Sequence, residues 1–413
     1  MQTFTFILIL VMAVVASQPL TRLFRIVPLP IIQIGLGAAL AWPTAGFHPR
    51  IDPELFLLLF IAPLLFADAW EAPKREYRKL LRPILSLAFG LVFFTTLFGG
   101  LALHWLVPSM PLPVAFALAA VLSPTDAVAV SAIVDKETVP KNLMHILEGE
   151  SLLNDASGLV IFRFATAAAL TGSFSLWQAS LAFLLAVAGG IAAGLLAVVV
   201  VSWTLKLLAK FDRIAPEAQV LVIMFLPFAA FLAAEAVHAS GVLAAVVAGL
   251  TVGRTRTANQ LSVSAYMLAH SFWTMLAFLL NGTLFVLLGL QLPAIIRTVP
   301  PALIDTHWLW QPLGIIVALT LCLILLRFVW ITVAIALSRV VSRRLRLEQF
   351  HTTLRTRLAG SVAGVRGAVT LAGVLSFPAL ALDGSPFPWR DVASFLITGE
   401  PLPAEKGPGA ALF

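Results

Sequence analysis

The sequence predicts an all-α membrane protein that crosses the bilayer many times. Hydrophobic residues make up 60% of the 413 residues and charged residues only 11%, and the mean hydropathy is +0.99. Soluble domains contain about 25% charged residues, and a soluble chain of this length could not place so much apolar surface in its core. Because backbone polar groups in lipid must be satisfied within the protein, we expect the spans to be helices.

Twelve apolar segments come close to the roughly 20 residues that a helix needs to cross the hydrocarbon core. They lie at about 3–17, 25–42, 54–70, 80–107, 113–134, 143–169, 177–208, 217–235, 238–252, 268–291, 310–338 and 358–377. A thirteenth begins near 390 but runs into a polar, Pro- and Gly-rich stretch at 400–409, so we expect that helix to be truncated. The predicted parts are a transmembrane domain at 1–397 and a polar tail at 398–413.

The basic residues predict the orientation of the chain. Most of the 27 lysine and arginine residues lie in one set of alternate loops, and the other set holds Arg50, Arg297 and Arg390. Cytoplasmic loops are enriched in Lys and Arg, so we expect the N-terminus outside a bacterial inner membrane. The net charge of +7 is then an orientation signal and does not indicate a nucleic-acid partner. Cys322 is the single cysteine, which excludes a disulfide framework.

Segment 113–134 contains a proline beside a carboxylate, in the order Ser123-Pro124-Thr125-Asp126. Pro124 removes a backbone donor and breaks the helix. Ionisable residues inside a membrane are candidates for function, and transporters bind ions at the ends of such broken helices. The alternative is a simple proline kink in which Asp126 caps the second half-helix.

Segment 143–169 contains Glu150-Ser151-Leu152-Leu153-Asn154-Asp155. Ser151 and Asp155, like Glu150 and Asn154, are four residues apart and share a helix face. At 1.5 Å per residue, Asp126 and Asp155 enter from opposite sides to depths of about 20 and 18 Å, near the middle of a core about 30 Å thick. Their hard oxygen ligands predict a site for an alkali cation or a proton, and not for zinc or copper.

A third intramembrane charge is Arg366, in the sequence Gly364-Val365-Arg366-Gly367. It lies about 12 Å inside the predicted bilayer, where an arginine needs a carboxylate partner. We assign it to Glu150, which lies on the stripe beside Asp155. The alternative is that Arg366 extends to the cytoplasmic interface.

In these motifs the sequence resembles the bacterial NhaP-type sodium/proton antiporters of the monovalent cation:proton antiporter-1 family, which are relatives of the animal sodium/hydrogen exchangers. The resemblance covers about residues 25–395 and rests on Ser-Pro-Thr-Asp-Ala-Val at 123–128, Gly-Glu-Ser-Leu-Leu-Asn-Asp at 149–155 and Arg-Gly-Ala-Val at 366–369. It implies inverted repeats of six transmembrane helices, two crossing discontinuous helices near the midplane, and a homodimer. Segment 177–208 would be the linker helix. Its small residues Gly190 and Gly194 could form a dimer face or pack within the chain.

The resemblance also implies roles for individual residues. Asp155, Ser151 and Asp126 would coordinate the cation, helped by the main chain at Thr125. Glu150 and Arg366 would form a structural ion pair, which Asn154 would hold. Na+, with K+ and Li+ as further candidate ions, would exchange for H+ by competition at Asp155 and by alternating access, without a cofactor or an enzymatic step. Asn154 beside a single Asp favours electroneutral exchange, with a role in pH and sodium homeostasis.

Two departures from the family pattern leave alternatives open. Relatives often carry a glutamate in the third segment, where this chain has Asp68 in a register that does not clearly match. The truncated thirteenth helix is compatible with a degenerate relative that does not transport. A K+/H+ antiporter of the same fold is a further alternative, since sequence does not reveal the size and field strength of the site. A passive cation channel would also use broken helices, but the predicted Glu150–Arg366 pair argues against it.

Overall fold

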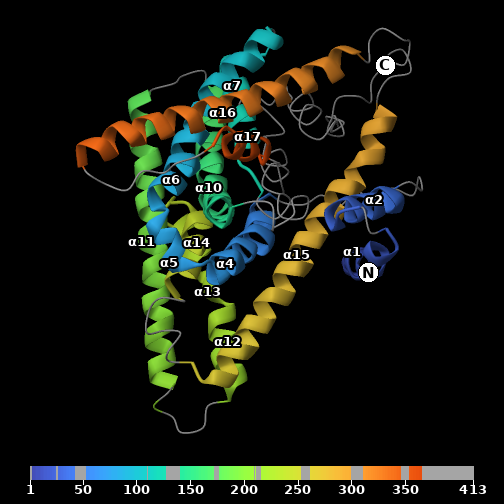
Figure 1. Ribbon diagram of the computed structural model, residues 1–413. Helices are drawn as coiled ribbons and strands as arrows, with labels where there is room; N and C mark the ends of the chain where they lie inside the picture. The colour runs from blue at the N-terminus through green and yellow to red at the C-terminus, as the bar shows by residue number, and fades with distance from the viewer. Residues whose placement is uncertain are drawn as a thin grey trace.

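The computed structural model confirms an all-helical protein over the residues that it describes (Figure 1). Those residues are 2–24, 27–41, 53–108, 110–126, 140–171, 176–208, 210, 215–252, 261–298, 310–345 and 353–364. The predicted thirteenth helix, the tail and Arg366 lie outside them. The equivalence of the two predicted repeats therefore stays a prediction.

The helices follow the predicted spans in order. They are α1 (Gln2–Leu23), α2 (Leu29–Ala41), α3 (Pro53–Phe56), η1 (Leu57–Ile61), α4 (Ala62–Glu71), α5 (Lys74–Lys79), α6 (Leu81–Leu85), η2 (Ser86–Leu91), α7 (Val92–Leu106), α8 (Leu112–Leu122), α10 (Lys141–Thr171), α11 (Leu176–Leu208), α12 (Pro216–Met224), α13 (Leu226–Glu235), α14 (Gly241–Val252), α15 (Val263–Thr298), α16 (Trp310–Leu345) and α17 (Leu354–Val362). Each of the first eleven predicted spans overlaps at least one of them over most of its described residues. The twelfth, 358–377, overlaps α17 only at 358–362, and its part from 365 onward lies outside the described residues.

Within the described part of the chain, six helical stretches are long and apolar enough to cross a membrane. The long helices α11, α15 and α16 surround α4, α10 and α14 (Figure 1). Large apolar side chains point outward from α11, among them Leu184, Leu185, Val199 and Trp203, each more than half exposed. An apolar outer surface of this kind is suited to contact with lipid, because exposing it to water would be unfavourable in free energy.

Two spans contain a wide helical turn that the sequence did not predict. The third span changes from α3 to the π-helix η1 and then to α4, and the fourth changes from α6 to the π-helix η2 and then to α7. π-helical turns are rare and occur frequently at functional sites. The second of them contacts two helices of the candidate site described below.

Small residues let the helices approach closely. A Cβ atom on Gly190 would lie 2.8 Å from the Ser240 carbonyl oxygen, and one on Gly194 would lie 2.5 Å from the Ala244 carbonyl oxygen. Both glycines therefore face α14 of the same chain. Of the two interpretations of this small-residue pattern, the structure supports packing within one chain.

The crossing of α2 and α15 gives a test of this packing by two matched substitutions. A Cβ on Gly37 would lie 2.1 Å from the Val286 carbonyl oxygen, whereas a Cβ on Gly35, in the same helix, would meet nothing within 4 Å. We expect Gly37→Ala to destabilise the protein by about 1–3 kcal/mol, because two backbones must move apart. Gly35→Ala should be neutral or stabilising by up to about 1 kcal/mol, through helix propensity. Thermal unfolding in detergent would compare them, and equal midpoints would contradict the close crossing.

Candidate cation and proton site

A buried ion pair joins α10 to α16 at the centre of the candidate site. Both terminal nitrogens of Arg327 donate to the Glu150 carboxylate, at 2.6 and 2.7 Å. The Nε–H of Arg327 donates to the Gly360 carbonyl oxygen on α17 at 2.7 Å. The side chains of Arg327 and Glu150 are 5% and 1% exposed. A buried carboxylate and guanidinium are tolerated in this form because each satisfies the charge and the hydrogen-bonding groups of the other.

In the described part of the chain, Arg327 is the charged partner of Glu150. Its terminal nitrogens contact both oxygens of the carboxylate, whereas Arg366, the partner that the sequence predicts, lies outside the described residues. The role of Arg366 itself stays a prediction. A signal for Arg327 was present in the sequence, since it lies in the middle of the apolar segment 310–338, where an arginine also needs a partner.

The predicted helix break lies directly beside this ion pair. Helix α8 ends at Leu122, and the chain from Ser123 to Asp126 is not helical. Gly158 on α10 makes room for the break, since a Cβ there would lie 2.6 Å from the Pro124 ring. The proline thus ends the helix as the sequence predicts, and a glycine on α10 accommodates its ring.

Two side chains connect the break to the ion pair. The Thr125 hydroxyl donates to Glu150 Oε1 at 3.3 Å, and Asn154 Nδ2 donates to the Thr125 oxygen at 3.0 Å. All three side chains are buried. Asn154 therefore supports the ion pair through Thr125, rather than by a direct contact with the carboxylate.

Three carboxylates gather next to this network. Asp155 on α10 is buried, with 7% of its surface exposed, and Asp126 is half-buried. The charges of Asp126 and of Asp68, on α4, both act on the Asp155 carboxyl. Ser151 is half-buried one helical turn before Asp155. The structure thus brings together the predicted carboxylates and adds Asp68, whose register the sequence left open.

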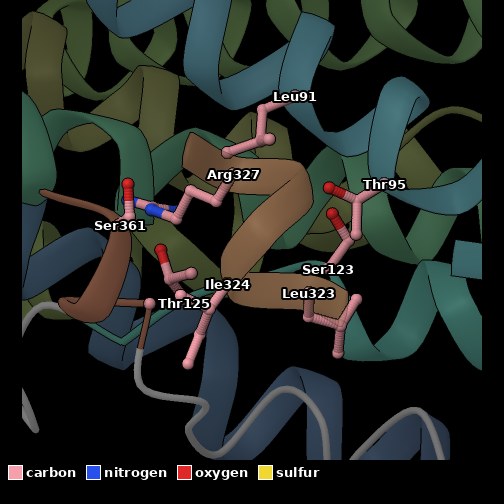
Figure 2. Close-up of a pocket in the computed structure, with 9 residues that line it drawn as sticks. Leu91, Thr95, Ser123, Thr125, Leu323, Ile324, Arg327 and Ser361 are labelled. Atoms are coloured by element: carbon pink, nitrogen blue, oxygen red, sulfur yellow. The ribbon is translucent and has the colours of Figure 1, made fainter. Parts of the chain in front are cut away.

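A small polar pocket is lined in part by Thr125 and Arg327 of this network (Figure 2). Figure 2 shows Thr125, Arg327 and Ser361 on one side of it and Thr95 and Ser123 on the other. In the described part of the chain, the buried Ser123 hydroxyl has no hydrogen-bond partner, and neither does Asn154 Oδ1. A buried polar atom without a partner costs about 1–3 kcal/mol, and a bound water or ion is one way in which such an atom is satisfied.

These features define a class of protein. A helical membrane protein that places carboxylates and hydroxyls at the end of a broken helix has the architecture of a secondary transporter. Comparison with known proteins narrows the class. The transmembrane family model of the sodium/hydrogen exchangers matches residues 6–398, and the chain belongs to that family. This confirms the resemblance found in the sequence motifs.

Proteins similar in sequence or in structure to this chain carry the names of exchangers and antiporters. A protein of Escherichia coli K12 called the uncharacterized Na(+)/H(+) exchanger YjcE is 45% identical over 97% of this chain and 73% of its own length. A Bacillus pumilus protein called a sodium, potassium, lithium and rubidium/H(+) antiporter is 40% identical over 97% of this chain, which spans 59% of that relative. The solved structure of the sodium proton antiporter MjNhaP1 from Methanocaldococcus jannaschii has a TM-score of 0.70 at 18% identity, covering 97% of this chain and 94% of that one, and shares its fold.

Proposed function

We propose that this protein is a secondary active antiporter that exchanges a monovalent cation for protons at Asp155. The observation that carries the proposal is the position of Asp155, which is buried beside the helix break with Asp126 and Asp68 within electrostatic range. A cation can neutralise such a group of carboxylates, and so can a proton. Because one site cannot hold both, occupation by one ion excludes the other.

Cation transport is coupled to proton transport if the site changes the side of the membrane to which it opens only while it holds a cation or a proton. We propose that α10, with Asp155 and Ser151, moves together with the break at Thr125 between states that open to opposite sides. Uncompensated carboxylates are costly in hydrocarbon, so the empty site would not cross. The Glu150–Arg327 pair would stay intact during this movement, because separating it would leave two buried charges unpaired.

The cation is an alkali ion in this proposal. The ligands are carboxylate, hydroxyl and carbonyl oxygens, which suit Na+, K+ or Li+. The name of the Bacillus pumilus relative includes four alkali ions, which supports a site of broad selectivity. Since Asn154 takes the place of a second adjacent carboxylate, we propose electroneutral exchange, in a homodimer in the bacterial plasma membrane with its N-terminus outside.

The test uses purified protein in liposomes with an imposed pH gradient and a fluorescent pH reporter. We expect Na+, K+ or Li+ to collapse the gradient, whereas choline should not. Dissipating the membrane voltage with the permeant anion thiocyanate, which is not a substrate of the proposed exchange, should leave the rate unchanged. Cation flux that needs no proton gradient and sets up a membrane potential would instead indicate a passive channel. Folded protein that gives no cation-dependent response would indicate a relative that does not transport.

A further inference from the structure

The π-helix η2 lies against both helices of the candidate site. The Ser157 hydroxyl on α10 lies 2.6 Å from the Ala88 carbonyl oxygen, its shorter contact, and 2.9 Å from the Asn154 carbonyl oxygen of its own helix. The Trp330 indole N–H on α16 donates to the Ser86 carbonyl oxygen at 3.1 Å. The Ala88 and Ser86 carbonyls are backbone groups of the same six-residue π-helix. One wide turn therefore provides hydrogen-bond acceptors to two helices that are far apart in the sequence.

The two donors stand close in sequence to the functional side chains. Ser157 is 1% exposed and follows Asp155 by two residues. Trp330 follows Arg327 by three residues, which is about one helical turn. Any sliding of α10 or α16 against η2 would therefore displace the Asp155 carboxyl or the guanidinium that holds Glu150.

The fit around η2 leaves little freedom for such sliding. Gly90 provides the space for the indole, since a Cβ there would lie 2.3 Å from Trp330 Cζ2. The indole also packs near Phe94, with ring centroids 5.2 Å apart. On the α10 side, a Cβ on Gly149 would lie 2.7 Å from Ile84 of α6. These close contacts hold α10 and α16 tightly against the segment that contains η2.

We propose that η2 sets the register between α10 and α16, and that Ser157 and Trp330 are positioning residues for the cation and proton site. Neither side chain binds the ion. Each fixes one helix to the same turn, which keeps Asp155 at a constant offset from the Glu150–Arg327 pair. The proposal rests on the proposed antiport function and adds the residues that hold its site in register.

The test compares variants that remove one hydrogen bond with little change in shape. Trp330→Phe keeps an aromatic ring beside Phe94 but removes the N–H, and Ser157→Ala removes the hydroxyl. For each variant we expect the half-saturating cation concentration to rise about fivefold, as the net loss of one hydrogen bond implies, together with a shifted pH profile. Gly90→Ala should give the same shift, since its methyl group displaces the indole.

Matched controls come from α11. Ser202 donates to the Val198 carbonyl oxygen of its own helix, and Trp203 is 62% exposed. Ser202→Ala and Trp203→Phe should leave cation affinity and the pH profile unchanged. In the double variant of Ser157 and Trp330, the effects should be non-additive, because both act through one turn.

Two outcomes would overturn the positioning role. One is a lower maximal rate or melting temperature with unchanged cation affinity, which would reduce both bonds to ordinary packing. The other is an effect of equal size in the α11 controls. The rise in melting temperature on adding Na+ or K+ also reports cation affinity. It allows the same variants and controls to be compared without a transport assay. The register can thus be tested separately, even if the wild-type protein carries out no exchange.

Discussion

Replacing Arg327 with methionine should destabilise the protein by about 3–5 kcal/mol, because it leaves the Glu150 carboxylate buried without its counter-charge. In the described part of the chain, the hydrogen bond from the Thr125 hydroxyl, at 3.3 Å, would then be the one left to the Glu150 carboxylate. Gly360 would also lose the hydrogen bond to its carbonyl oxygen. The measurement is the unfolding transition of detergent-solubilised protein, followed by intrinsic fluorescence.

Arg163 provides a matched control for this prediction. It makes a similar two-pronged pair with Glu235, at 3.1 and 3.3 Å, but the two side chains are 51% and 31% exposed. An exposed pair contributes at most about 1 kcal/mol, so Arg163→Met should have a small effect. If Arg327→Met were no more destabilising than Arg163→Met, burial would not be the source of the difference.

A second variant tests the physical reason for the loss. In Glu150→Gln combined with Arg327→Met, neither side chain carries a charge, so the cost of an orphaned carboxylate disappears. The double variant should therefore be more stable than Arg327→Met alone. If it were equally unstable, the loss would come from the methionine's fit and not from the unpaired charge.

The sequence predicted the helical spans and the helix break because both depend on local chemistry. A run of apolar residues defines a span wherever lipid is the solvent, and Pro124 ends α8 within two residues of its own position. Asp155 was likewise predicted from its depth along one helix, which needs only the rise per residue. None of these inferences requires knowledge of how the helices are arranged around one another.

The contact between Glu150 and Arg327 could not be predicted in the same way. Arg327 is 177 residues away in sequence, and both Arg327 and Arg366 lie inside predicted spans. Depth alone does not distinguish them, because the choice depends on which helix faces α10 and at what rotation. The two π-helices were missed for a related reason: η1 and η2 have apolar sequences, Leu-Leu-Leu-Phe-Ile and Ser-Leu-Ala-Phe-Gly-Leu, which suit an α-helix equally well.

Asp155→Asn should reduce cation-dependent exchange in liposomes to the level of empty vesicles, because the amide can neither release a proton nor neutralise a cation. The fold should survive, since the substitution is nearly isosteric and removes one of three carboxylates that repel one another. We therefore expect the variant to be at least as stable as the wild type. A loss of function without loss of stability is the signature of a residue retained for activity.

The companion variants Asp126→Asn and Asp68→Asn show which carboxylate carries the exchanged proton and which ones contribute only to cation affinity. If Asp155 alone carries the exchanged proton, both companions should retain exchange with weaker cation affinity, because each removes negative charge but leaves the titrating group in place. Retained exchange in Asp155→Asn, with loss in either companion, would transfer the proton-carrying role to that residue. Since the three carboxylates lie on three separate segments, that result would also identify which segment must move with the ion.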